Sequence, residues 1–249
     1  MVPVLPGFTR VNSQPKPRII LSIEGLDKSG KTNLAFTAPG PLGYLEFDIG
    51  AEGVVEKFQD DKVILSPKPY ETRFDDGKQK QDATVELSRF ERDFKSSLSK
   101  LRTTVVDTAS ETWELLRLAR HGKLTQVKPH HYVEANQEYR DFIRTAFEND
   151  SNLILLHKLK STWMEGKDGK SSKTGEYERA GFSETGFLVQ MNVRCWRQEA
   201  VEGDLGFRCQ ILNSRHQPEL AGMILENEQI TFQTLGMMAL PQLDPAVWE

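Results

Sequence analysis

The chain has 249 residues, which is enough for one α/β domain with a sizeable core and small additions. Its formal net charge of −4 excludes a protein that coats nucleic acid through bulk positive charge, so any DNA contact must come from a local basic patch. No apolar run is long enough to span a bilayer, and the first residues lack the features of a secretory signal, so we expect a cytoplasmic protein with no membrane partner.

Residues 1–18 contain four prolines and little periodicity, which predicts an extended N-terminal arm. This arm is either a loose tail or a segment that docks on a neighbouring subunit. After it we expect a main domain over residues 19–235 and a C-terminal tail over residues 236–249, of which residues 240–249 are expected to be exposed. The two cysteines, Cys195 and Cys209, have no metal-ligand spacing and flank a predicted turn, so they could lie near each other as free thiols.

Residues 25–32, GLDKSGKT, fit the phosphate-binding P-loop pattern G-x-x-x-x-G-K-[ST] without substitution. The apolar residues 19–23 before them predict a buried parallel strand, and residues 33–38 predict a short helix, which the prolines of residues 39–41 end. Glycines at both ends let the backbone N–H groups curl around a polyphosphate, and the helix N-terminus adds positive potential. The pattern therefore predicts a nucleotide site made of Gly25, Leu26, Asp27, Lys28, Ser29, Gly30, Lys31, Thr32 and Asn33.

Two side chains of this loop have predicted chemical roles. Lys31 is expected to contact the β- and γ-phosphates in catalysis and the Thr32 hydroxyl to bind Mg²⁺, so ATP and Mg²⁺ are the expected cofactors. A second predicted strand, residues 42–47, is followed by the acidic residues Asp48 and Glu52. Because α/β sheets bind ligands at this edge, Glu52, with Asp48 as second candidate, is expected to orient the attacking water. Either carboxylate could instead hold a turn or cap the next helix.

The middle of the chain predicts alternating strands and helices. Asp107 ends the β-branched run of residues 103–107, which is typical of a Walker B strand. Its carboxylate is therefore a candidate catalytic group and Mg²⁺ ligand alongside Thr32. The other predicted elements are a strand at residues 63–65, an exposed loop at 67–82, a helix from Thr84, a capped helix from Thr108 that Gly122 ends, and a helix over 133–149.

A buried strand at residues 152–156 is followed by His157, which is either a catalytic sensor of the γ-phosphate or a histidine bonded to a loop carbonyl. Residues 158–186 predict a long mobile loop rich in glycine, serine and lysine. Its lysines could contact DNA phosphates while Trp163 and Tyr177 stack on bases, and a solvated loop is the alternative. The candidate DNA-binding lysines are Lys158, Lys160, Lys167, Lys170 and Lys173.

The end of the chain is rich in predicted β-structure. Residues 187–196 and 207–212 predict a hairpin around a turn at 201–204, and residues 229–232 could add a strand. The nearby arginines are either surface residues or candidates for acting on the nucleotide of a neighbouring subunit. These candidates are Arg179, Arg194 and Arg197.

The segment from Glu24 to Thr32 resembles the start of thymidylate kinases, which carry an E-G-x-D-x-x-G-K motif. Those kinases continue into a long uninterrupted helix, whereas residues 39–41 stop the helix here. The chain also has neither an Asp-Arg-Tyr-type motif nor the arginine-rich lid that those kinases use. A thymidylate-like nucleoside-monophosphate kinase is therefore an alternative function.

A larger part of the chain, residues 19–232, resembles the phage-encoded RecA-like ATPases of the AAA class, including the RecA-like single-strand annealing proteins of phage recombination systems. The P-loop with its short helix, the acidic strand end at residues 47–53, the strand that ends in Asp107 and the order of the later elements carry this resemblance. It implies a RecA-like α/β nucleotide-binding domain, with a mostly parallel sheet flanked by helices and antiparallel hairpins at its C-terminal end.

The same resemblance implies an ATPase that engages single-stranded DNA in recombination, replication or repair. It also implies assembly as a homo-oligomer, with a single-strand-binding or replication protein as a possible partner. A third possibility is a nucleotide-gated DNA-binding module with little hydrolysis.

Overall fold

The computed structural model describes residues 15–48, 50–58, 60–74, 77–123, 128, 131–165, 171–199 and 205–249. Most of the predicted N-terminal arm and the predicted turn at residues 201–204 lie outside these ranges, as do the candidate DNA-binding residues Lys167 and Lys170. Among the residues that are described, none of the helices combines the length and the apolar character needed to cross a bilayer.

The described residues form a nine-stranded sheet in the order β3-β2-β4-β5-β1-β7-β8-β9, and β6 pairs with β5 outside this order. Neighbours from β3 to β7 in that order are parallel, whereas β7–β8, β8–β9 and β5–β6 are antiparallel. The strands are β1 (Ile20–Gly25), β2 (Leu42–Glu46), β3 (Ile64–Leu65), β4 (Thr103–Asp107), β5 (Asn152–Glu165), β6 (Ser171–Arg179), β7 (Met191–Glu199), β8 (Leu205–Ser214) and β9 (Ile224–Glu226).

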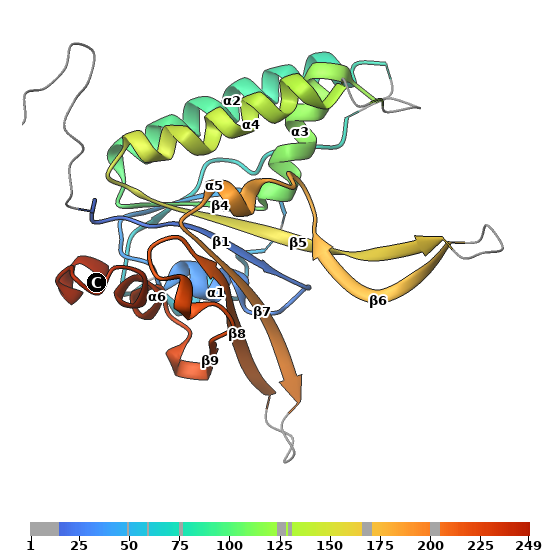
Figure 1. Ribbon diagram of the computed structural model, residues 1–249. Coiled ribbons are helices and arrows are strands. Elements are labelled where there is room, and N and C mark those ends of the chain that lie inside the picture. Colours follow the sequence, from blue (N-terminus) through green and yellow to red (C-terminus); the bar gives the residue numbers. More distant parts are fainter. Residues whose placement is uncertain are drawn as a thin grey trace, which may run out of the picture.

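Helices cover both faces of the sheet (Figure 1). On one face lie α2 (Gln79–Lys100), α3 (Ala109–His121) and α4 (His131–Glu148), and on the other lie α1 (Lys31–Phe36) and α6 (Phe232–Ala239). In β1, Ile20 packs in the core under the first group of helices, while Leu21 and Ile23 pack in the core that contains α1 and α6. A strand covered on both faces buries side chains on each of them, and all six residues of β1 are buried, including the polar Ser22 and Glu24. The remaining helical segments are η1 (Val55–Lys57), α5 (Thr185–Leu188), η2 (Pro218–Leu220), η3 (Asn227–Gln229) and η4 (Pro245–Trp248).

The predicted fold class is confirmed, because the sheet is mostly parallel, helices flank it, and antiparallel strands close it at the C-terminal end. Local signals also hold. The Thr108 hydroxyl accepts a hydrogen bond from the backbone N–H of Glu111 (3.2 Å) and caps α3, which Gly122 ends with a φ of 66°. Cys195 and Cys209 are cross-strand partners in β7 and β8, and both are buried free thiols.

Residues 158–186 differ most from the sequence prediction. Instead of a loop, β5 and β6 form an antiparallel hairpin that projects from the sheet (Figure 1). The loop prediction rested on glycine and lysine content. Cross-strand pairs between Ser161 and Tyr177 and between Trp163 and Lys173 stabilise extended backbone instead.

Two predicted boundaries also shift. Helix α2 begins at Gln79 rather than Thr84. The prediction began too late because the first turn of the helix is polar and adds nothing to the apolar stripe on which it was based. Strand β7 begins at Met191 rather than at residue 187, because the residues before it form the short helix α5.

The predicted exposure of the C-terminal residues 240–249 holds for six of them and is wrong for the two that are buried. Helix α6 crosses the predicted boundary at residue 236, and Leu240 and Trp248 are buried in the core that contains α1. Residues 229–232 are not a strand but join η3 to α6, whose first turn is capped by the Thr231 hydroxyl, which accepts from the N–H of Thr234 (3.1 Å). The apolar residues near the terminus therefore belong to the core.

Candidate functional site

A cleft of about 1000 Å³ lies where the parallel strands β1, β2 and β4 end. Residues 27–33 of the P-loop all line it, so most of the predicted nucleotide-binding residues meet there. The lining is completed by Asp48, Gly50, Glu52, Val54, Lys57, Asp107, Thr108, Lys158, Cys195, Phe207, Arg208, Asn227, Glu228 and Ile230. The C-terminal strands therefore contribute to the same cleft as the P-loop, which sequence reasoning did not predict.

Close packing explains the glycines of the loop. A Cβ at Gly25 would lie 2.4 Å from Ser29 Oγ and 2.6 Å from the carbonyl oxygen of Cys195. Gly30 has a φ of 88°, in the left-handed region that favours glycine.

The Ser29 hydroxyl is buried and has no hydrogen-bond partner among the described residues. A buried polar group without a partner is one that a bound ligand can satisfy, so the loop fits a polar ligand such as a phosphate.

The Lys31 side chain folds back over this loop. Its ammonium donates to the carbonyl oxygens of Gly25 (3.0 Å) and Leu26 (2.8 Å). Burial lowers the pKa of Lys31, while the charges of Asp107 and Asp27 oppose that shift. Because charge-assisted hydrogen bonds to a phosphate are stronger than bonds to neutral carbonyls, a phosphate can displace both partners.

Asp107 lies beside Thr32, although β5 separates β4, which ends in Asp107, from β1, which precedes the P-loop and α1. Its Oδ2 accepts hydrogen bonds from the Thr32 hydroxyl (3.0 Å) and from the hydroxyl of Tyr44 on β2 (2.8 Å). Burial raises the pKa of Asp107, and these two hydrogen bonds act against that shift. Tyr44 was not predicted, because a tyrosine in an apolar strand gives no signal of its carboxylate partner.

The side-chain oxygens of Thr32 and Asp107 fit Mg²⁺ as ligands, but they do not suit a metal held by protein side chains alone. No cluster of three or more His, Cys, Asp or Glu side chains that could hold a metal occurs in the part of the chain that the structure describes. Mg²⁺ usually takes one or two protein oxygens and completes its shell with waters and phosphate oxygens. The oxygens of Thr32 and Asp107, next to a phosphate-binding loop, are such a pair.

The acidic residues after β2 have distinct environments. Glu46 Oε1 accepts hydrogen bonds from the N–H groups of Gly50 (2.9 Å) and Ala51 (3.3 Å), so it is this residue that holds the turn. Glu52 is exposed where it lines the cleft and has no hydrogen bond or ion pair with the described residues. Asp48 lies 2.5 Å from the ammonium of Lys158.

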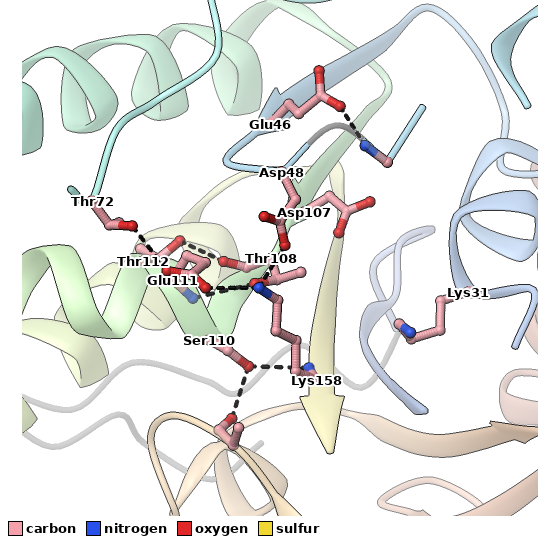
Figure 2. A network of polar contacts seen from close by, with 12 residues as sticks. Lys31, Glu46, Asp48, Thr72, Asp107, Thr108, Ser110, Glu111, Thr112 and Lys158 are labelled. Carbon is pink, nitrogen blue, oxygen red and sulfur yellow. Dashed lines mark hydrogen bonds and ion pairs between the residues drawn. The ribbon is translucent and has the colours of Figure 1, made fainter. Parts of the chain in front are cut away.

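Lys158 is the centre of a polar network at the cleft (Figure 2). Its ammonium lies between Asp48 and Glu111, whose Oε1 is 2.7 Å away, and Glu111 Oε2 accepts from the Thr72 hydroxyl (3.0 Å). Burial alone would lower the pKa of Lys158, but the hydrogen bonds to both carboxylates outweigh it and raise this pKa. The sequence grouped Lys158 with DNA-binding lysines, whereas the structure places it in the cleft. Its position directly after the buried part of β5 was the available signal.

His157 does not reach the cleft. It is fully buried and neither ring nitrogen has a hydrogen-bond partner among the described residues. Burial and the charge of Arg179 lower its pKa to about 3, so the ring is neutral near pH 7. The geometry therefore gives no support to a role as γ-phosphate sensor.

A buried ion network precedes the P-loop and was also missed. Glu24, in β1, accepts from Arg179 Nε (2.8 Å) and Arg194 Nε (2.7 Å). Arg179 donates further to Asn192 Oδ1 (2.9 Å) and is mostly buried. Both arginines are thus engaged within their own chain, which removes support for their acting on a neighbouring subunit.

The hairpin carries the remaining candidate DNA-binding residues that the structure describes. Lys160 pairs with Glu178 (3.1 Å), and the Lys173 ammonium lies 5.6 Å from the centre of the Trp163 ring. Trp163 is 60% exposed and Tyr177 44%, which is unusual for aromatic rings in a folded domain. These side chains form an exposed aromatic and polar surface away from the cleft.

Comparison with known proteins gave solved structures alone. No protein-family model matches the chain, and no curated protein matches it in sequence. The chain is similar to the structure of a KaiC-like protein from the hyperthermophilic archaeon Pyrococcus horikoshii OT3, at 14% identity and a TM-score of 0.45, covering 85% of this chain and 84% of that one. It is also similar to the flagellar accessory protein FlaH from Methanocaldococcus jannaschii, at 10% identity and a TM-score of 0.45, covering 84% of each chain.

Proposed function

We propose that the chain is a RecA-like P-loop ATPase that binds ATP with Mg²⁺ in the cleft and hydrolyses it. The observation that carries the proposal is the contact between Thr32 and Asp107, which lie 75 residues apart in sequence and meet beside the P-loop. This contact joins the two motifs that would share one Mg²⁺ ion, and Lys31 lines the same cleft.

Each residue then has a defined part in the reaction. The loop N–H groups and the Lys31 ammonium would bind the phosphates and stabilise the charge that develops on the transferring group. Thr32 and Asp107 would hold Mg²⁺, which when bound neutralises charge on the β- and γ-phosphates. Glu52 would orient the attacking water, because it lines the cleft and has no ion pair with the part of the chain that the structure describes.

We further propose that the β5–β6 hairpin engages single-stranded DNA. Support comes from the exposed rings of Trp163 and Tyr177 and from Lys173, which lies over the first ring. Aromatic side chains on an extended ribbon offer stacking surfaces to unpaired bases regardless of sequence. On the basis of the sequence resemblance, we also propose a cytoplasmic role in phage recombination, replication or repair. The protein would act as a homo-oligomer and bind a single-strand-binding or replication protein.

Phosphate release from ATP, measured with and without single-stranded DNA, tests both parts together. Hydrolysis that rises with DNA is the expected result. ADP formed together with dTDP from ATP and dTMP would instead indicate the thymidylate-like kinase. DNA retention that needs ATP and persists in Glu52→Gln, with no phosphate release in the wild type, would indicate a nucleotide-gated binding module.

A further inference from the structure

We propose that Lys158 contacts the γ-phosphate of the bound nucleotide, and that Asp48 and Glu111 hold its ammonium at the cleft until a triphosphate arrives. This inference rests on the proposed ATPase function and assigns one more residue to it. Lys158 would thereby distinguish a triphosphate from a diphosphate.

The position of Lys158 relative to the P-loop supports this role. Lys158 is the parallel partner of Gly25 in the β5–β1 ladder, so its backbone lies beside the first residue of the loop. Its N–H donates to Ser110 Oγ (3.1 Å), and that hydroxyl donates to the carbonyl of Ala180 (3.0 Å). With the backbone held in this way, reorientation is confined to the side chain, which lines the same cleft as Lys31.

The charges around Lys158 favour an exchange of partners. The side chains of Lys158, Asp48 and Glu111 are 36%, 49% and 25% exposed, so water reaches their ion pairs and partly screens them. A phosphate offers the ammonium a full negative charge and several acceptor oxygens. A diphosphate lacks the γ-group, so with it bound the ammonium would remain with the carboxylates.

Calorimetry with a non-hydrolysable ATP analogue and with ADP, each with Mg²⁺, tests the proposal on Lys158→Met. The analogue should bind about tenfold more weakly than to the wild type, while ADP affinity changes less than about twofold. Lys68→Met is the matched control, because Lys68 is an exposed lysine with a carboxylate partner, Glu71, at 3.7 Å. An equal loss of affinity for both nucleotides, or no loss, would overturn the proposed role of Lys158 but not the proposed ATPase function. Wild-type protein that binds neither nucleotide would overturn the proposed function as well.

Asp48→Asn provides a test that does not depend on the folding of the lysine variant. If Asp48 competes with the phosphate for Lys158, its removal should tighten analogue binding by about two- to threefold and leave ADP affinity unchanged. The gain should vanish when Asp48→Asn is combined with Lys158→Met. A gain that persists in the double variant would mean that Asp48 acts on the phosphate directly, and would overturn the holding role.

Discussion

The cleft and the β5–β6 hairpin are built in opposite ways. Contacts in the cleft join residues far apart in sequence, such as Thr32 with Asp107 and Lys158 with Glu111, at separations of 75 and 47 residues. Contacts in the hairpin are local, and Thr162 bonds to Thr174 only 12 residues away. The cleft geometry therefore depends on the whole sheet, whereas the hairpin depends on two strands.

The two regions also differ in how they use charge. In the cleft, burial shifts the pKa of Lys31 downward and that of Asp107 upward. A phosphate beside Lys31 and a cation beside Asp107 would oppose these two shifts, because each favours the charged form of its neighbour. Along residues 159–178 the four lysines are matched by Glu165, Asp168, Glu176 and Glu178. The hairpin is therefore close to neutral, and any DNA contact there must depend on its aromatic rings. This difference separates the expected effects of mutations in the two regions.

The largest effect is expected in the cleft. Lys31→Ala should lower the rate of ATP hydrolysis by at least about 100-fold, because a half-buried cation that stabilises the transferring group is lost. Thermal unfolding should change little, since the bonds of this ammonium to described residues are to two carbonyls of its own loop. Hydrolysis that survives in this variant would contradict the assignment of the P-loop.

A second effect concerns His157, which lies between the two regions. Its pKa is lowered to about 3 in the folded chain, against about 6.5 in the unfolded chain. Between about pH 3 and about pH 6.5 His157 is protonated in the unfolded chain but not in the folded chain. Its contribution to the free energy of unfolding is therefore fully present above about pH 6.5 and is lost as the pH falls toward 3. Urea unfolding across this range should show a weaker pH dependence in His157→Leu. Equal pH dependence in both proteins would contradict the buried neutral ring.

A smaller effect is expected at the hairpin. Trp163→Ala should weaken single-stranded DNA binding by about 1–3 kcal/mol if one base stacks on the ring. Fluorescence anisotropy with a labelled oligonucleotide measures this. Met164→Ala is the control, because Met164 is the next residue and is equally exposed, at 63%. Equal losses in both variants would argue against stacking.

The smallest effect should come from the hairpin lysines. Because Lys160 pairs with Glu178 and the segment is nearly neutral, Lys160→Met should change the slope of log affinity against log salt by less than about 0.7, the value for one phosphate contact. A change in this slope equivalent to several phosphate contacts would mean that DNA binding depends on charge rather than on stacking.

Sequence reasoning succeeded where the signal was local. The P-loop pattern and the cap at Thr108 depend on residues a few positions apart; the cap is present, and residues 27–33 of the P-loop line one cleft. It also located Asp107 beside Thr32, because parallel strands end at one edge of a sheet.

The failures share a physical cause. Tyr44, Glu24 and Lys158 obtain their partners only when distant strands come together, and no local pattern reports that. The hairpin was missed because cross-strand pairing, rather than composition, decides whether a lysine-rich segment is extended. The buried Trp248 was missed because a short terminal segment gives no periodicity to reveal a buried face.

The central claim is that Thr32 and Asp107 hold Mg²⁺ for a nucleotide in the P-loop. Calorimetric titration of the wild-type chain with ATP, with and without Mg²⁺, and of Asp107→Asn under the same conditions tests it most directly. We expect Mg²⁺ to tighten ATP binding in the wild type and to have little effect in Asp107→Asn. Binding that ignores Mg²⁺ in both proteins, or no ATP binding at all, would contradict the account.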